Sequence, residues 1–481
     1  MKTIKILFLI AIVPLVGFSQ NCNCLDNYNW VKKTFEENDA GYLLALKQKG
    51  NIAYEKHNEV FERKIQLITD AKECELALRE WLAFFRPGHL TIRLLSTKQS
   101  TSSSSSMNNE EIIEKYKDWD NISTTEVEFK DYLQSKSEFD YEGIWVSGPY
   151  KIGIKKNNDK YLGFIIDGDG VYWRKGQIKL RIAEDTAVYY MRNHSASKFI
   201  DFELIGNNYL QIGFITLKRV FPEFDTDKST ENYIKSISAQ KPFSQRLSNS
   251  TILLRIPSFS GSEKKLIDSV IMANNSALST TENLILDLRN NSGGSDRSYK
   301  EILPYLYTNP VRKVGVEFLS TPLNNKTIER YLNDPNISEE DLLWVKESLG
   351  KLQSNPGRFV NLNSSRVTIS KLDSVYEYPQ NIGIIINENN GSTAEQFLLA
   401  AKQSRKVKLF GTTTMGVLDI SNMNFVVSPS GEFQLGYCLS KSMRIPEMTI
   451  DNKGIQPDYY IDKDIPKYKW IEFVERTLNE N

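Results

Sequence analysis

The chain has 481 residues, of which 40% are hydrophobic, and its 60 Lys and Arg are balanced by 60 Asp and Glu. This length exceeds what one ordinary hydrophobic core holds, so two or three domains are expected. A formal net charge of zero provides no polycationic surface, and neither nucleic acid nor an anionic membrane is expected as a partner.

The first residues have the pattern of a secretory signal peptide. Lys2 and Lys5 precede an apolar run over 6–18, which Pro14 interrupts. The run is too short to cross about 30 Å of hydrocarbon, so a cleaved signal fits better than a membrane span. We expect 1–20 to be a signal peptide and the protein to be periplasmic or extracellular, without a stable span. A lipoprotein attached at Cys22 is the second choice, because the small residues expected just before a lipidated cysteine are missing.

Export permits disulfides, and the chain has four cysteines. Cys24 and Cys74 lie in two segments with helical spacing and form the preferred pair. The Cys22–Cys74 pair and four reduced thiols stay open as alternatives, because pairing cannot be read from a sequence. Cys438 lies in the strand-like run "FQLGYCLS" and is expected to be a buried free thiol. Cys22-x-Cys24 lacks a second ligand pair, and no metal or cofactor is expected.

The N-terminal half divides by its pattern into three parts. Residues 21–95 carry apolar residues three and four apart, which predicts a helical segment that ends at Pro87 and Gly88. The serine-rich stretch within 96–140 predicts a linker followed by a short helix. Short alternating runs within 141–245 predict an antiparallel β-rich domain of about seven strands.

Residues 246–481 alternate between strand and helix patterns. The runs "TILLRI", "ENLILDL" and "NIGIIIN" read as strands, and each is followed by a helical segment. This succession predicts an α/β core with a largely parallel sheet.

Three loops in this core contain residues that can carry chemistry. The first, "LDLRNNSGG", places Gly293 and Gly294 after a strand, where glycines let backbone N–H groups face one point. The second, "NENNGSTAEQF", places Ser392 before a helix. The third, "TIDNKGIQPDYYI", contains two candidate carboxylates, Asp451 and Asp458. Each loop taken singly also fits an ordinary turn or cap.

Ser392 has two interpretations. Ser392-x-x-Glu395 is a capping-box pattern, which stabilises a helix by about 1 kcal/mol without chemistry. A serine hydroxyl at a helix N-terminus also lies near free N–H groups, which favour developing negative charge. The backbone N–H of Thr393 is then a candidate oxyanion donor.

A serine nucleophile needs a base, and the chain has three histidines. His57 lies on a predicted helix among charged residues and is expected to be solvated. His194 lies in a loop between strands. His89 lies in "RPGHL", where Pro87 and Gly88 form a helix-to-strand corner that can hold an imidazole in place.

Together the three loops resemble the C-terminal processing (tail-specific) peptidases and the tricorn-type core proteases, a family of serine peptidases. "LILDLRNNSGG", "INENNGSTAEQFLLAAKQSRKVKLFGTTTMG" and "KGIQPDYYI" are similar to its three motifs in order and spacing. The resemblance covers about 250–467. It implies a crotonase-like (ClpP-like) core, an acyl-enzyme on Ser392, and oxyanion donors at Gly293 or Gly294 and at Thr393.

The resemblance also indicates which branch supplies the base. Processing peptidases carry a lysine base where this chain has Val417, and valine cannot accept a proton. The tricorn-like branch uses an upstream histidine and an acidic residue before the last motif, and His89 and Asp451 match these positions. The implied triad is therefore Ser392, His89 and Asp451, while Asp458 shapes a turn.

The sequence thus predicts an exported serine-type peptidase that acts on peptides or proteins. Two alternatives stay open: an inactive relative that binds peptides or small apolar ligands, and a hydrolase of a non-peptide ester or amide. The β-rich segment, which lacks the glycine-loop pattern of a PDZ domain, is expected to gate or dock substrate. The sequence does not indicate an oligomeric state.

Overall fold

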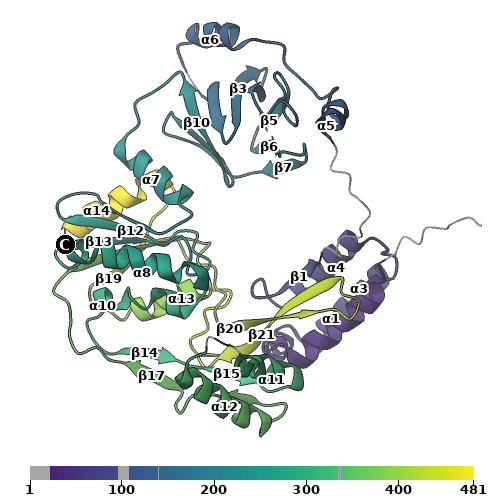
Figure 1. Cartoon of the computed structure of the whole chain (residues 1–481), viewed down its shortest axis with the longest axis vertical. Coiled ribbons are helices and arrows are strands. Elements are labelled where there is room, and N and C mark those ends of the chain that lie inside the picture. The colour runs from purple at the N-terminus through teal and green to yellow at the C-terminus, as the bar shows by residue number, and fades with distance from the viewer. Residues whose placement is uncertain (1–21, 96–107, 139, 334, 336, 481) are drawn as a thin grey trace, which may run out of the picture. The chain divides into compact units, whose positions relative to one another are not determined.

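The computed structural model describes residues 22–95, 108–138, 140–333, 335 and 337–480 (Figure 1). The expected signal peptide and most of the serine-rich run lie outside the described residues. Within those ranges, no helix is long and apolar enough to cross a membrane.

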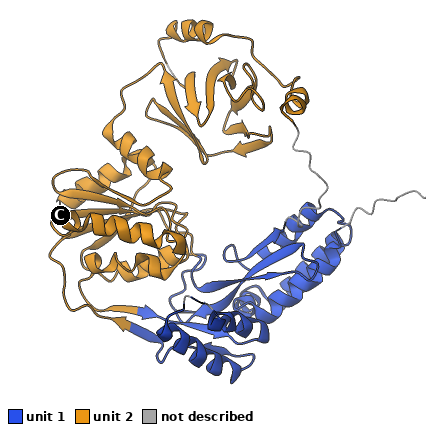
Figure 2. Cartoon of the chain, in the orientation of Figure 1, with its two compact units in different colours: residues 1–98, 313–368, 417–452 blue, residues 99–312, 369–416, 453–481 orange. Residues whose placement is uncertain are grey.

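The chain forms two compact units, each built from three separate segments (Figure 2). Unit 1 comprises residues 1–98, 313–368 and 417–452, and unit 2 comprises 99–312, 369–416 and 453–481. The units are therefore discontinuous, whereas the sequence pattern suggests consecutive domains. The chain passes from unit 2 to unit 1 between Gly416 and Val417.

Unit 1 packs helices against an antiparallel sheet. Its core joins buried aromatic residues of the N-terminal helices, such as Phe35 and Trp81, to Leu435 and Tyr437 of one long strand. The helices are α1 (Cys24–Asn38), α2 (Tyr42–Lys49), α3 (Asn51–Ile65), α4 (Ala71–Ala83), α11 (Pro322–Glu329) and α12 (Glu339–Gln353). The strands are β1 (Thr91–Leu94), β15 (Val316–Leu319), β16 (Phe359–Asn361), β20 (Ile420–Val427) and β21 (Phe433–Ser442), and each pairs antiparallel.

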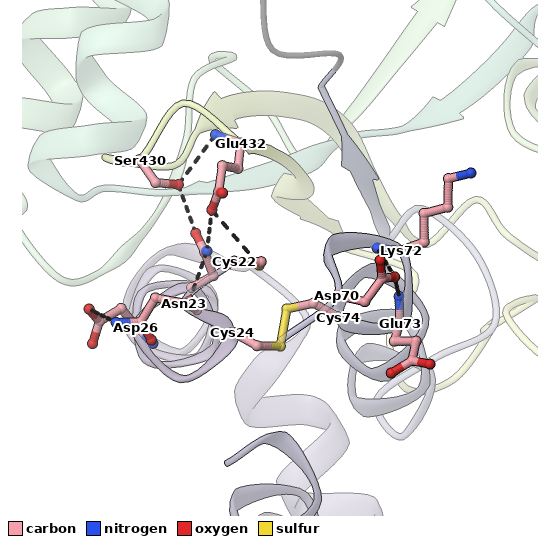
Figure 3. Close-up of a disulfide and its surroundings, with 11 residues drawn as sticks. Cys22, Asn23, Cys24, Asp26, Asp70, Lys72, Glu73, Cys74, Ser430 and Glu432 are labelled. Carbon is pink, nitrogen blue, oxygen red and sulfur yellow. Dashed lines mark hydrogen bonds between the residues drawn. A yellow bond between two sulfur atoms is a disulfide. The ribbon is translucent and has the colours of Figure 1, made fainter. Parts of the chain in front are cut away.

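A disulfide between Cys24 and Cys74 ties α1 to α4 (Figure 3). The preferred pairing is therefore confirmed, and the Cys22–Cys74 alternative is wrong. Cys22 and Cys438 are buried free thiols, as expected for Cys438. Figure 3 also shows the Cys22 thiol beside the Glu432 carboxylate, at 3.9 Å.

The β-rich part of unit 2 is a nine-stranded antiparallel sheet, in the order β7-β6-β5-β4-β3-β2-β10-β9-β8. The expectation of about seven strands falls short because one apolar run can hold two strands. "YLQIGFITL" contains β9 and β10, and Gly213, with φ of 54°, lies between them. The strands are β2 (Gly143–Ser147), β3 (Tyr150–Asn157), β4 (Lys160–Asp167), β5 (Ile178–Ala183), β6 (Thr186–Tyr190), β7 (Ala196–Phe199), β8 (Phe202–Ile205), β9 (Tyr209–Ile212) and β10 (Ile215–Phe221), preceded by α5 (Asn109–Lys115) and α6 (Glu126–Gln134).

The rest of unit 2 is a six-stranded sheet in the order β11-β12-β13-β18-β19-β22. In this order, the neighbouring strands from β12 onward pair in parallel. The edge strand β11 pairs antiparallel with β12. The strands are β11 (Phe243–Arg246), β12 (Thr251–Arg255), β13 (Asn283–Asp287), β18 (Asn381–Ile386), β19 (Val407–Gly411) and β22 (Tyr459–Tyr460). β14 (Val311–Val314) and β17 (Val367–Ser370) pair with each other where the chain changes units.

Helices flank this sheet, which fits the run of apolar residues in its strands. The apolar side of α14 (Trp470–Glu480) packs on Leu253, Ile285 and Ile385. Figure 1 shows α8 (Lys264–Ala273), α10 (Leu303–Leu306) and α13 (Thr393–Ala401) on the opposite side from α14 and α7 (Lys228–Ser238). The mixed α/β class is therefore confirmed, although the nine-stranded and five-stranded sheets make most of the pairing antiparallel.

Candidate active site

The motif loops of unit 2 follow the carboxyl ends of adjacent parallel strands. β13 leads into 288–294, β18 into 387–392 and β19 into 412–416. The carboxyl ends of parallel strands meet at one edge of the sheet, which is where open α/β sheets bind their ligands. The order of the strands therefore brings two of the predicted motifs together.

Ser392 lies on a strained turn between β18 and α13. Its backbone has φ of 56° and ψ of −122°, in a region that residues with a side chain rarely occupy. A strand-to-helix turn of this kind exposes a nucleophilic serine in other hydrolases. A helix cap normally has extended backbone, so this conformation favours the nucleophile interpretation over a plain cap.

The strain at Ser392 is held by the buried carboxylate of Glu395. Its side chain is 0% exposed and accepts hydrogen bonds from Ser392 N (3.1 Å), Thr414 Oγ1 (2.6 Å) and Gly416 N (2.7 Å). Thr414 Oγ1 in turn accepts from Ile455 N at 2.7 Å. Glu395 therefore supplies its half of the expected capping box and also joins three motif loops.

Gly293 and Gly294 lie against the Ser392 turn. A Cβ atom on Gly293 would lie 2.8 Å from Thr393 N and 2.9 Å from Ser392 Cβ, so only glycine leaves this space open. Thr393 Oγ1 donates to Gly294 O at 3.0 Å. Ser392, Thr393 and the two glycines are therefore brought together, as the oxyanion-hole prediction requires.

The two glycines differ as oxyanion donors. Gly293 N donates to Asn291 Oδ1 at 3.0 Å, so this N–H is already used. Within the described residues, the N–H of Gly294 donates to no acceptor. Thr393 is the first residue of α13, where backbone N–H groups lack helical partners. The pair best suited to bind an oxyanion is therefore Gly294 N and Thr393 N.

Asn390 and Asn291 form a buried scaffold beneath these loops, and both are 0% exposed. Asn390 Nδ2 donates to Leu288 O (2.5 Å) and Asn291 O (3.0 Å), while its Oδ1 accepts from Asn387 N (2.7 Å). Because buried amides without partners are costly, these bonds fix the glycine loop against the serine turn.

His89 lies in unit 1, at the corner between α4 and β1. Its φ is 54°, and its Nδ1 lies 2.7 Å from the carbonyl oxygen of Ile420. A carbonyl accepts only, so Nδ1 carries the proton and Nε2 keeps a lone pair. Burial, more than the charge of nearby Arg86, lowers the pKa of His89 below its usual value, so the ring is neutral at pH 7. This tautomer and this charge state suit a general base.

A buried ion pair holds this corner. Arg86 binds both oxygens of Asp39, at 2.7 and 2.6 Å, and also donates to the carbonyl of His89 at 3.1 Å. The exposed fractions of the two paired side chains are 9% and 0%. Bidentate pairs of this kind are the more strongly oriented ones, so the corner has a fixed geometry.

Val417 packs directly on the same corner. A Cβ atom on Gly88 would collide with Val417 Cγ1, which means that the valine side chain covers the glycine next to His89. Val417 is 7% exposed. The residue that stands where a lysine base would be therefore contacts the loop that carries the histidine.

Asp451 reaches His89 only through the backbone. Its carboxylate accepts from the N–H groups of Leu418 (2.7 Å), Asp419 (2.6 Å) and Ile420 (3.3 Å). Ile420 O is the group that faces the imidazole. Asp451 thus holds the strand whose carbonyl orients His89, which is a less direct role than the triad implies. Burial raises the pKa of Asp451 to about 6.

The sequence reasoning missed a second buried carboxylate in this region. Asp419 is 0% exposed, pairs with Arg444 at 3.0 Å, and accepts from Ile450 N (2.6 Å) and Asp451 N (2.9 Å). It anchors the loop that carries Asp451. The sequence marked neither Asp419 nor Asp39, since an acidic residue just before a strand or just after a helix has no local signature of burial.

The other two histidines have packing roles. His57 Nε2 lies 3.1 Å from Trp81 O, and its ring stacks on Phe84, so the expected solvated position is wrong. His194 is 6% exposed and stacks between Tyr116 and Trp173 at 3.8 and 3.9 Å. Asp458 accepts from Leu409 N of β19 at 2.8 Å, a bond to the neighbouring strand, and its role in the turn stays a prediction.

Ser392, Thr393, Gly293 and Gly294 belong to unit 2, while His89, Val417 and Asp451 belong to unit 1. Each unit has its own internal geometry, and the pairing of Ser392 with His89 stays a prediction.

The fold and the serine turn define an α/β protein with the local architecture of a serine hydrolase. Residues 250–461 match the model of "Peptidase family S41", a family of serine-type peptidases. The resemblance drawn from the three motifs is thereby confirmed.

Solved structures show the same fold at low sequence identity. Mature CPAF complexed with lactacystin is 12% identical, with a TM-score of 0.53 over 95% of this chain and 99% of that chain. Mature CPAF alone is 13% identical, with a TM-score of 0.51 over 95% and 96%. No curated protein matches the sequence significantly.

Proposed function

We propose that this protein is an exported serine peptidase in which Ser392 forms an acyl-enzyme and His89 is the base. The observation that carries the proposal is the Ser392 turn, with φ of 56°, set against Gly293 and Thr393 within a segment that matches Peptidase family S41. The substrate class, peptide or protein, follows from the family.

In the proposed reaction, Ser392 Oγ attacks the peptide carbonyl and its proton passes to His89 Nε2. The N–H groups of Thr393 and Gly294 stabilise the oxyanion. The imidazolium then protonates the leaving amine as the C–N bond breaks. Water, deprotonated by His89, releases the acid product and restores the serine.

The placement of the motif loops after adjacent parallel strands supports the proposal of a crotonase-like core. The Cys24–Cys74 disulfide supports export, because such bonds persist in oxidising compartments. N-terminal sequencing of the protein recovered from the periplasm or medium tests export. A mature chain that still begins at Met1 contradicts it.

A fluorophosphonate probe tests the nucleophile. The wild-type protein should be labelled, and Ser392→Ala should lose the label. Ser338→Ala is the matched control. Ser338 caps α12 by accepting a 3.1 Å hydrogen bond from Asp341 N, so this substitution removes only a capping hydroxyl. Equal labelling of wild type and Ser392→Ala, or no labelling at all, contradicts the proposal.

A second pair of variants tests the base. His89→Ala should lose peptidase activity while the Ser392 hydroxyl stays in place, and His57→Ala, which removes another histidine of unit 1, should retain it. Full activity of His89→Ala refutes the triad and leaves the nucleophile standing.

The two alternatives predict different results in the same assays. An inactive ligand-binding relative is neither labelled nor active, and Val417 in place of a lysine is the observation in its favour. A non-peptide hydrolase is labelled and cleaves p-nitrophenyl esters but no peptide. The gating role of the β-rich segment predicts that deleting 141–220 changes the ratio of long to short peptide cleavage.

A further inference from the structure

The outer edge of β1 in unit 1 offers unpaired backbone groups. β1 is the terminal strand in the sheet order and pairs with β21. Within the described residues, no strand pairs with its other side. An edge strand of this kind is a template for another extended chain.

The register tells which groups point outward. Leu95 N donates to Glu432 O at 2.6 Å. The backbone N–H and C=O groups of Leu95, and of Arg93 and Thr91 two and four residues before it, therefore face β21. Ile92 and Leu94 therefore direct their N–H and C=O groups away from β21. A long contact agrees with this, since Arg79 Nη2 reaches the outward carbonyl of Ile92 at 3.4 Å.

A groove of about 520 Å³ runs along this edge. One wall comes from α4, and Phe425 of β20 contributes the other. The ring of Phe425 lies over Gly436, where a Cβ atom would be 2.8 Å from its Cε1, and Phe425 is 48% exposed. The groove is lined by Arg79, Leu82, Ala83, Arg86, Pro87, Leu90, Thr91, Ile92, Arg93 and Phe425.

The charge of the groove is positive. Arg86 is neutralised by Asp39, and Arg79 pairs with Glu75 at 3.0 Å. Arg93 is exposed and makes no ion pair with any described residue. Arg93 shares a sheet face with Thr91, while Ile92 points into the core on the other face. An extended chain beside β1 would thus meet a cationic face and an apolar face.

We propose that this groove binds an extended peptide of alternating acidic and apolar residues, added as a strand to the edge of β1. Backbone bonds to Ile92 and Leu94 supply the affinity, and the alternating side chains supply the specificity. The acidic side chains face Arg93, and the apolar ones face Ala83 and Leu90. This deepens the proposed function by naming a substrate class, because Pro87 and Leu90 of the groove flank His89.

Direct binding tests the inference apart from catalysis. We would titrate Ser392→Ala with a fluorescein-labelled hexapeptide of alternating Val and Glu, and with Val–Gln and Val–Lys versions. The Val–Glu peptide should bind about tenfold more tightly than the Val–Lys peptide. Arg93→Glu should reverse this order, while Arg63→Glu, the same charge change on α3, should not. Equal affinity for all three peptides, or no binding, overturns the proposal.

Backbone substitutions test the strand geometry. N-methylation of alternate peptide residues should abolish binding in one parity and spare it in the other. Leu94→Pro should weaken binding about tenfold, because its N–H points outward and is not needed by β21. Binding insensitive to both changes overturns strand addition.

The outcomes separate this inference from the proposed function. Selective binding to Ser392→Ala together with an inactive wild type supports the groove and refutes the peptidase. Cleavage by the wild type, with kcat/KM equal for the three peptides and unchanged in Arg93→Glu, refutes the groove and leaves the peptidase standing.

Discussion

Ser392 in unit 2 and His89 in unit 1 both have a positive φ but are held by different forces. Both are non-glycine residues with positive φ, 56° and 54°. Backbone and neutral groups around the buried Glu395 fix the serine turn. The Arg86–Asp39 ion pair and the Val417 side chain fix the histidine corner.

This difference shows two ways to stabilise an unfavourable conformation. A strained residue costs on the order of 1–3 kcal/mol, and the surroundings must supply more than that. The serine turn does so with hydrogen bonds that also place oxyanion donors. The histidine corner does so with charge and packing, and no described residue is bonded to His89 Nε2.

Removing Asp39 should have the largest effect on stability. Asp39→Ala leaves the buried Arg86 charge without a partner, which costs about 3–5 kcal/mol. Urea unfolding measures this loss. The control is Glu75→Ala, which breaks the exposed pair with Arg79 and should cost less than about 1 kcal/mol. Equal midpoints for the two variants would show that the corner does not depend on the pair.

Crowding Gly293 should impair the serine turn without touching the corner. In Gly293→Ala, the new Cβ meets Thr393 N and Ser392 Cβ at a residue with φ of 104°. We expect kcat to fall about 10²- to 10³-fold, the loss typical of a disrupted oxyanion hole. Gly357→Ala has φ of 73° and open space around it, so it controls for backbone strain. Unchanged kcat in Gly293→Ala contradicts the oxyanion assignment.

Trimming Val417 should have a smaller effect that is specific to the corner. Val417→Ala removes two methyl groups that cover Gly88 and should destabilise unit 1 by about 1–2 kcal/mol. Because the His89 imidazole is then held less firmly, kcat should also fall several-fold. Calorimetry and steady-state kinetics measure the two effects. Activity that rises in Val417→Lys, together with activity that survives His89→Ala, would instead favour a lysine base.

The pH dependence should separate the corner's two titrating groups. His89 acts as base only when neutral, and its pKa is lowered, so kcat/KM should fall with acid through a midpoint below 6.5. The same shift makes the His89 contribution to stability complete above 6.5 and lost below it. Asp451 has the opposite effect on stability. Because its pKa is raised to about 6 in the folded protein, its protonation stabilises the fold at low pH, and this contribution is lost as pH rises from about 4 to 6.

The Asp451→Asn variant completes this test. It should remove the loss of stability between about pH 4 and 6 and leave the acid limb of kcat/KM in place. If Asp451→Asn shifts the midpoint of the acid limb of kcat/KM and substitutions of Arg86 do not, the limb reports titration of the Asp451 carboxylate and not of the His89 imidazole.

The sequence predicted those parts of the molecule that local patterns determine. Apolar spacing indicated α1 and α4, and alternating runs indicated the β-rich sheet, although a turn at Gly213 hid a strand. The glycine and serine motifs could be placed because parallel strands put their carboxyl ends at one edge. The Cys24–Cys74 pairing was preferred because both cysteines lie in helical segments, and the contact of α1 with α4 in the fold decided between it and the alternatives.

The supports of the histidine corner could not be predicted. Asp39, Arg86, Asp419 and Arg444 lie far apart in sequence, and each resembles an ordinary surface charge until the fold buries it. The role of Val417 also depends on contact with Gly88, which no local pattern encodes. The sequence thus indicated the groups that can react, and the long-range packing that orients them became visible only in three dimensions.

The contact of His89 with Ile420 also sets when the histidine can be oriented during synthesis of the chain. The two residues are separated by 331 positions, and β1 cannot pair until β21 has been made. Contacts at such separation form late in folding. A growing chain therefore has its histidine before it has the carbonyl that orients it. Under the proposed assignment of His89 as the base, only a nearly complete polypeptide can orient that base.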